Sequence, residues 1–162
     1  MPGSDQDEIH TEPNPLRRLW LPLSRSKMSN HDPIVITLPG GRRVDAQVGT
    51  HTIHTDQPRD NGGEDLAPAP YDVFLASIGA CAGIFVQGFC AKRDIPTGGI
   101  RIVERPSFGA DGELTEVDLE LQLPPSFPEK YRDAVVKVAA QCSVKRAIAA
   151  QPKFIVRATT GT

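Results

Sequence analysis

The segment YDVFLASIGACAGIFVQGFCAKR, residues 71–93, decides the fold class. It predicts a helix with apolar side chains on nearly every face, and such a helix is buried in a core. Pro70 and Asp72 suit its first turn, where proline lacks only an unneeded N–H and an acid meets the positive end of the helix dipole. Its glycines allow another backbone to come close. We therefore expect a long, central, buried helix that carries Cys81 and Cys90.

Alternating apolar and polar residues on both sides of this helix predict strands. A hairpin is expected over 34–48, turning at Pro39-Gly40-Gly41, and extended chain continues through 51–55. The further elements are strands at 100–106 and 117–123, helices at 128–141 and 143–150, and a last strand through 154–158. This order predicts an α+β fold with a mostly antiparallel sheet, not the alternation of a nucleotide-binding fold.

Length and composition limit the class of protein. The 162 residues fit one domain, expected over 31–162, after a poorly ordered N-terminal extension over 1–30 without a targeting signal. A net charge of −2 gives no broad basic surface, so no nucleic-acid partner is expected. We also expect no apolar run long enough to cross a membrane. Three cysteines are too few for a secreted disulfide scaffold. The composition favours a cytoplasmic protein.

The three cysteines differ in what their positions allow. Cys81 and Cys90 are nine residues apart on one helix, a rise of roughly 13 Å, so they cannot form a disulfide with each other. Cys142 falls between two predicted helices, from which it could reach either of the others. Each cysteine could be a small buried hydrophobic residue, and Cys81 and Cys142 could equally do redox chemistry.

A reactive Cys81 would need help, because apolar surroundings raise a thiol pKa and no helix N-terminus is expected near it. An arginine is the natural cation, and an acid such as Glu64 or Asp72 could orient it. The residues alone do not choose among the candidates Arg42, Arg43, Arg59, Arg101 and Arg146. His51 and His54 face opposite sides of a predicted strand, so we expect no metal site.

Two stretches resemble the OsmC/Ohr family: GGEDLAPAPYDVFLASIGACAG, residues 62–83, and AAQCSVKRAI, residues 139–148. The resemblance extends over about 33–160. It is nearest to the OsmC-like branch with a G-H-x4-D stretch, in which Thr50 replaces the glycine while His51 and Asp56 match.

The resemblance implies a thiol peroxidase that reduces organic hydroperoxides in oxidative stress defence. Cys81 is then the peroxidatic cysteine, and Cys142 resolves its sulfenic acid as a disulfide that an external dithiol reduces. The family fold implies an intertwined homodimer with both active sites at the interface. It implies no metal and no organic cofactor.

The resemblance also suggests supporting residues. Asp72 stands where the OsmC-like branch has an orienting acid, whereas Tyr71 stands where better-known members have glutamate. The family's hairpin arginine makes Arg42 or Arg43 the expected activating cation. Phe74, Ile78 and Phe85 are expected to line a substrate pocket. The alternative is a non-catalytic OsmC-like module that holds a small apolar or thiol-reactive ligand at the dimer interface.

Overall fold

The structure is a computed structural model that describes residues 32–160. The chain divides into two units, residues 1–33 and residues 34–162, and the second contains every helix and strand described below. The predicted N-terminal extension over 1–30 lies outside the described residues.

The first sheet is a three-stranded antiparallel meander. Its strands are β1 (Val35–Gly40), β2 (Arg43–Val48) and β3 (His51–Thr55), in the order β1-β2-β3. The first turn requires glycine, because Gly40 and Gly41 have φ values of +123° and +61°, which side chains disfavour. The predicted hairpin and the extended segment after it are confirmed. This sheet exposes apolar side chains, among them Ile36 and Leu38, at 53% and 80%.

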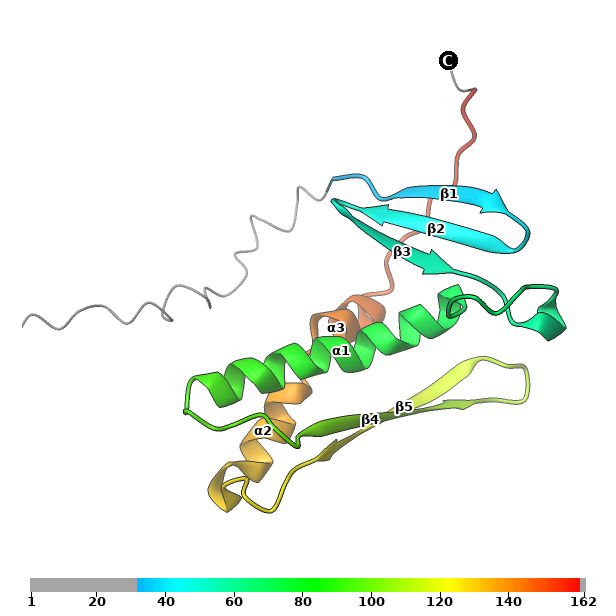
Figure 1. The fold of residues 1–162 in the computed structure, drawn as a ribbon. Coiled ribbons are helices and arrows are strands. Elements are labelled where there is room, and N and C mark those ends of the chain that lie inside the picture. The colour runs from blue at the N-terminus through cyan, green and yellow to red at the C-terminus, as the bar shows by residue number, and fades with distance from the viewer. Residues whose placement is uncertain (1–31, 161–162) are drawn as a thin grey trace, which may run out of the picture. The chain divides into compact units, whose positions relative to one another are not determined.

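Helix α1 (Pro70–Ala91) is the long helix that the sequence predicts. Figure 1 shows it between the first sheet and the hairpin of β4 (Arg101–Phe108) and β5 (Leu114–Gln122). Gly83 faces Ile102 of β4, and a Cβ there would make an ordinary contact of 3.7 Å with the Ile102 side chain, so this approach does not require glycine. On β5 the acids Asp118 and Glu120 face outward and pair with Arg105, as the alternation predicts for a strand with one solvent-exposed face.

Two short helices complete the core. The predicted helix over 128–141 is divided into the 3-10 turn η4 (Glu129–Tyr131) and α2 (Arg132–Ala139), and α3 (Ser143–Ala149) follows after Cys142. A second 3-10 turn, η3 (Arg59–Asn61), lies in the polar loop before α1. The buried core is made of Ala82, Val86, Phe89, Cys90, Ile95, Phe127, Val135, Ala139 and Cys142.

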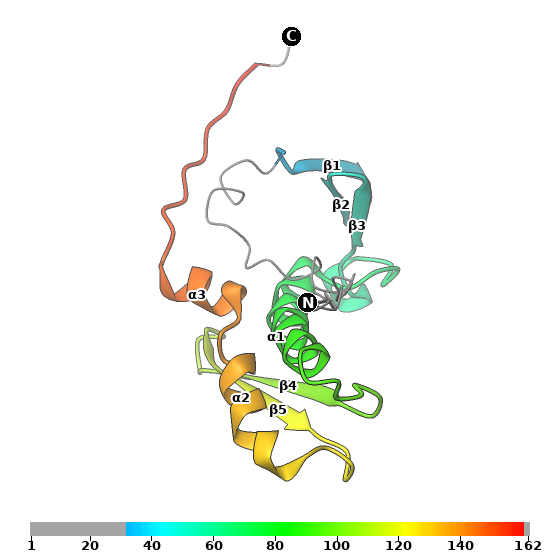
Figure 2. The same ribbon diagram turned by 90° about the vertical axis from the view of Figure 1, so that its left-hand side faces the viewer.

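The prediction of a last strand through 154–158 is wrong for the single chain. Residues 150–160 form no strand, and Figure 2 shows this segment running free of both sheets. In the single chain this segment pairs with none of the described strands, and Phe154 and Val156 are 86% and 96% exposed. The strands also form two separate antiparallel sheets rather than one.

Helix α1 is less buried than the sequence analysis expects. One side packs against β4, α2 and α3, but only 28% of its most apolar window is buried within the chain. Its 22 residues, with a mean hydropathy of 1.9 in that window, are also long and apolar enough to cross a membrane. The expectation that no such run exists is therefore wrong. Length and apolarity are weak evidence for a membrane span, because the core helices of globular folds share them.

Candidate functional site

The structure brings Cys81 and Cys142 together. Cys81 lies midway along α1, and Cys142 is the residue that joins α2 to α3 and is fully buried. The Cys142 thiol donates to the carbonyl oxygen of Ile78, at 3.7 Å, and also hydrogen-bonds with Cys81. Ile78 is one helical turn before Cys81, so both groups that meet Cys142 are on one face of α1. All three cysteines are free thiols.

The surroundings of Cys81 favour its thiolate. Burial acts to raise the pKa of Cys81, but the combined interactions with its neighbours outweigh this and hold the pKa below its ordinary value. They are the backbone N–H of Val144, the Cys142 thiol, the backbone N–H of Ser143 and the positive charge of Lys145. Hydrogen bonds and a nearby cation stabilise the charged sulfur directly.

The surroundings of Cys142 raise its pKa. Burial raises its pKa, and the charge and hydrogen bond of Cys81 raise it further, although the backbone N–H groups of Lys145 and Val144 act against this. The surroundings thus shift the pKa values of the two adjacent thiols in opposite directions. Cys81 is therefore the more acidic of the two thiols, as a nucleophile beside its resolving partner needs to be.

Two groups that act on Cys81 were missed by the sequence reasoning. We expected no helix N-terminus near Cys81, but the backbone at the start of α3 lowers the pKa of Cys81, and Cys142, which directly precedes α3, packs against α1 at Ile78. Lys145 was also missed, since the search was for arginine. The signal that could have found both is the position of Cys142 directly before a helix, with a lysine three residues later.

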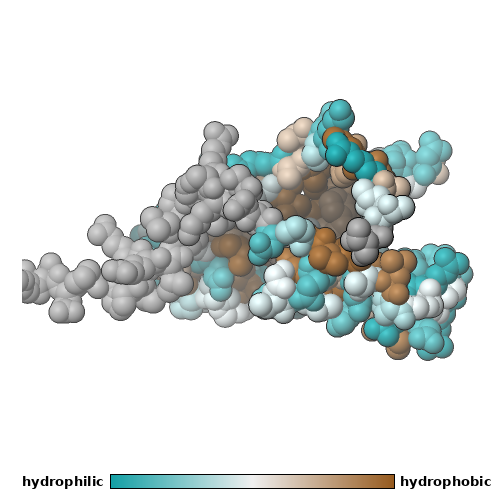
Figure 3. All heavy atoms as spheres, turned by 90° about the horizontal axis from the view of Figure 1, so that it is seen from above, coloured by the Kyte–Doolittle hydropathy of each residue, from teal (hydrophilic) through white to brown (hydrophobic). Residues whose placement is uncertain are grey.

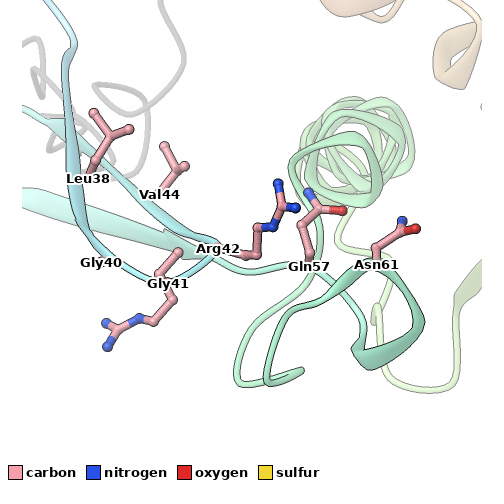
Figure 4. A pocket seen from close by; sticks show the side chains of 8 residues that line it. Leu38, Gly40, Gly41, Arg42, Val44, Gln57 and Asn61 are labelled. Carbon is pink, nitrogen blue, oxygen red and sulfur yellow. The ribbon is translucent and has the colours of Figure 1, made fainter.

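The residues predicted to activate Cys81 lie elsewhere in the single chain. Arg42 reaches toward Gln57 at a pocket of about 540 Å³ between the β1–β2 turn and the loop after β3, as Figure 4 shows. Arg43 exerts its charge on Asp56. Asp72 is exposed in the first turn of α1, nine residues and roughly 13 Å along the helix axis from Cys81. Their roles at Cys81 stay predictions.

The loop between β3 and α1 is organised by Asp56. This carboxylate is 1% exposed and accepts hydrogen bonds from the backbone N–H groups of Gln57, Glu64 and Leu66. Burial acts to raise its pKa, but these three bonds and the Arg43 charge outweigh the effect and lower it. Gly63 fits only without a side chain, because a Cβ there would overlap the Gln57 backbone. Hydrogen bonds within the loop therefore hold its conformation.

The expected pocket residues differ in burial. Ile78 is 1% exposed beside the thiol pair, Phe85 is half-buried, and Phe74 is 37% exposed and in contact with the ring of Tyr71. Cys90 is fully buried in the core and burial raises its pKa, so it packs as a small hydrophobic residue. Among residues 32–160, no group of three or more metal-ligating side chains is placed to hold an ion.

A carboxyl group, that of Glu104, also lies where β4 packs against α1. Glu104 packs against Gly79 of α1, and its Oε1 atom is buried without a hydrogen-bond partner. Burial raises its pKa. Gly79 is two residues before Cys81 and so faces about 200° away from it around α1, which separates Glu104 from the thiol pair.

An α+β fold in which a cysteine of a long helix meets a second, buried cysteine between two short helices defines the class of protein. The chain belongs to the OsmC-like protein family, whose model matches residues 62–157, more than half of its length. No curated protein matches the sequence.

Solved structures share the fold. One, from Psychrobacter arcticus and named for osmotic stress induction and detoxification response, has a TM-score of 0.64 and 21% identity, covering 73% of this chain and 88% of its own. An OsmC-like protein from Mycoplasma pneumoniae has a TM-score of 0.60 and 16% identity, covering 75% and 89%. An organic hydroperoxide resistance protein from Elizabethkingia anophelis has a TM-score of 0.53 and 23% identity, covering 76% and 93%.

Proposed function

We propose that the protein is a homodimeric, cysteine-based thiol peroxidase that reduces organic hydroperoxides. The observation that carries this proposal is that the buried Cys142 thiol lies against α1 beside Cys81, where the pKa of Cys81 is lowered and that of Cys142 is raised. Cysteines that only pack are expected to have a pKa raised by burial, as Cys90 has. The name of the Elizabethkingia relative, an organic hydroperoxide resistance protein, agrees with the reaction.

The proposed reaction follows from the different acidities of the two thiols. The Cys81 thiolate attacks the terminal oxygen of the hydroperoxide, the S–O bond forms as the O–O bond breaks, and the alkoxide takes up a proton to leave as an alcohol. Cys142 then attacks the sulfenic sulfur, and the hydroxyl leaves as water when the disulfide forms. An external dithiol reduces the disulfide by two electrons. We propose that this occurs in the cytoplasm, whose thiol systems are reducing.

The apolar surface of the single chain supports a dimer. Ile84 on α1 is 59% exposed, and apolar residues of β1 and of the segment 154–156 are exposed as well. Figure 3 shows hydrophobic side chains gathered in a recess of one face. Soluble monomers rarely expose contiguous apolar surface of this kind. A second copy would cover it, and it could bring Arg42 or Arg43 of one chain to Cys81 of the other.

Three serine variants test the peroxidase proposal. Cys81→Ser is expected to lose at least about 99% of the consumption of cumene hydroperoxide, because alkoxide formation from serine is negligible at neutral pH. Cys142→Ser is expected to complete one turnover and stop at a sulfenic acid, detected by dimedone labelling and mass spectrometry. Cys90→Ser is the matched control and should keep its activity.

The same experiment separates peroxidase from binding module. Equal, slow consumption by all three variants and the wild type, without a disulfide between Cys81 and Cys142, contradicts the proposal. That result would favour the alternative of a non-catalytic module holding a small apolar or thiol-reactive ligand at the dimer interface.

A further inference from the structure

The two cysteines of the thiol pair differ in their access to solvent. Cys142 is 0% exposed and belongs to the buried core with Phe127 and Val135. Cys81 packs against that core from α1 but is only half-buried. A reagent in solution can therefore reach Cys81 without a change of fold, whereas it can reach Cys142 only after the core opens.

The position of Cys142 explains its burial. It lies between α2 and α3, and its Sγ atom is 3.7 Å from the carbonyl oxygen of Ile78 on α1, itself a residue that is 1% exposed. Three helices thus enclose one sulfur. A second copy of the chain would cover further surface and uncover none, so Cys142 stays closed in the proposed dimer as well.

We propose that the dithiol that reduces the Cys81–Cys142 disulfide attacks the sulfur of Cys81 and forms its mixed disulfide there, rather than at Cys142. The inference rests on the proposed function for the part that the disulfide plays in turnover, whereas the exchange itself needs only the disulfide. Peroxide and reductant then reach the same sulfur, one after the other.

The exchange consists of two balanced displacements. A thiolate of the reductant attacks Sγ of Cys81, a new S–S bond forms as the bond to Cys142 breaks, and Cys142 takes the electron pair and a proton to become a thiol. The second thiolate of the reductant then attacks the reductant sulfur that is bound to Cys81. This step closes the reductant's own disulfide and releases Cys81 as a thiolate, so two electrons have passed to the protein.

Acidity alone favours the opposite choice. Attack on Cys142 would expel Cys81, the more acidic of the two thiols, and a thiol of lower pKa leaves faster. Access outweighs this preference, because a core position of a stable domain is open in fewer than about one molecule in a thousand. The second displacement does expel Cys81, so the acidity of this thiol favours release of the reductant.

The test locates the first mixed disulfide. The full chain is oxidised with diamide, which joins the two cysteines without a peroxide, and is then mixed with 2-mercaptoethanol, a monothiol that cannot close a ring. Acid stops the exchange at successive times, N-ethylmaleimide blocks the free thiols, and mass spectrometry locates both groups. At the earliest times we expect mercaptoethanol on Cys81 and maleimide on Cys142, in at least about tenfold excess over the reverse.

Two comparisons test whether access causes the preference. In about 8 M urea both sulfurs of the unfolded disulfide are open, so the two adducts should form in amounts within about threefold of each other. Cys90→Ser is the matched control, because it removes a fully buried thiol outside the pair. Its folded form should give the same excess on Cys81 as the wild type.

Mercaptoethanol found mainly on Cys142 would overturn the inference, as would equal adducts in the folded protein. A preference for Cys81 that persists unchanged in urea would also overturn it, because the cause would then be chemical and not access. Failure of diamide to join Cys81 to Cys142 would do the same, since no such disulfide would exist for a reductant to attack.

Peroxide assays on the same proteins separate the two proposals. Exchange at Cys81 without any consumption of cumene hydroperoxide would keep the inference and reject the peroxidase. Peroxide consumption that depends on Cys81, together with the mercaptoethanol adduct on Cys142, would do the reverse.

Discussion

At the scale of single residues, the pKa of a buried acidic group depends on backbone N–H groups as much as on charged side chains. Cys81 and Asp56 are both partly or fully buried, and in both the lowered pKa depends on N–H groups of the main chain. Such donors need no lysine or arginine in the sequence, so composition gives no sign of them. The folding of a loop or a helix start toward the acid is what supplies them.

Asp56→Asn tests the role of the buried carboxylate. The variant should have a lower urea midpoint than the wild type at pH 7, because an amide accepts fewer and weaker bonds from Gln57, Glu64 and Leu66. The folded-state pKa is lowered, so this stability is present above the unfolded value of about 3.9 and is lost as the pH falls through the folded value.

Urea denaturation between pH 7 and pH 3 measures the difference between the two proteins. The gap should narrow as the pH falls, while Asp60→Asn, an exposed acid in the same loop, should leave the midpoint unchanged throughout. A gap that is absent at pH 7 or constant down to pH 3 would show that the charge of Asp56 does not stabilise the fold.

At the scale of elements, periodicity identified most of the structure. The apolar segment over 71–93 and the strict alternation at 117–123 became α1 and β5, because both patterns are local. The last strand could not be predicted correctly in the same way. The alternation at 154–158 indicates an extended backbone, but a strand also needs a neighbouring strand with which it forms hydrogen bonds. Proximity of Cys81 to Cys142 followed from the family resemblance, but the N–H donors and Lys145 depend on how α3 meets α1.

Neighbouring valines on α2 provide an internal comparison of packing. Val135 is 0% exposed and Val136 is 53% exposed. Val135→Ala should lower the free energy of unfolding by about 2–3 kcal/mol through lost burial and the remaining cavity, whereas Val136→Ala should change it by less than about 0.5 kcal/mol. Equal losses in a urea titration would mean that the exposed face of α2 is covered in solution.

At the scale of the whole molecule, the distribution of apolar surface predicts the assembly. Light scattering should give a mass of about 35 kDa, twice the 17.5 kDa of one chain. Ile84→Glu should shift the mass toward that of one chain, because it places a charge in the apolar face of α1.

The control for this change is Glu116→Lys, which alters a charge on the exposed face of β5 and should leave the mass at about 35 kDa. A wild-type mass of one chain at micromolar concentration would contradict the dimer. It would leave the apolar face of α1 to be covered in some other way.

The position of Cys142 between two helices has a thermodynamic consequence. A bond from Cys142 to Cys81 would tie the α2–α3 joint to α1 and close a loop of about 60 residues. The chain-entropy model gives such a cross-link about 4 kcal/mol of stabilisation against unfolding. By the same cycle, the folded chain favours disulfide formation more than the unfolded chain does, by an equal amount. The melting temperature of this protein would then depend on the redox state of the two cysteines. The disulfide form should be more stable to heat than the dithiol form, and each turnover would pass through both forms.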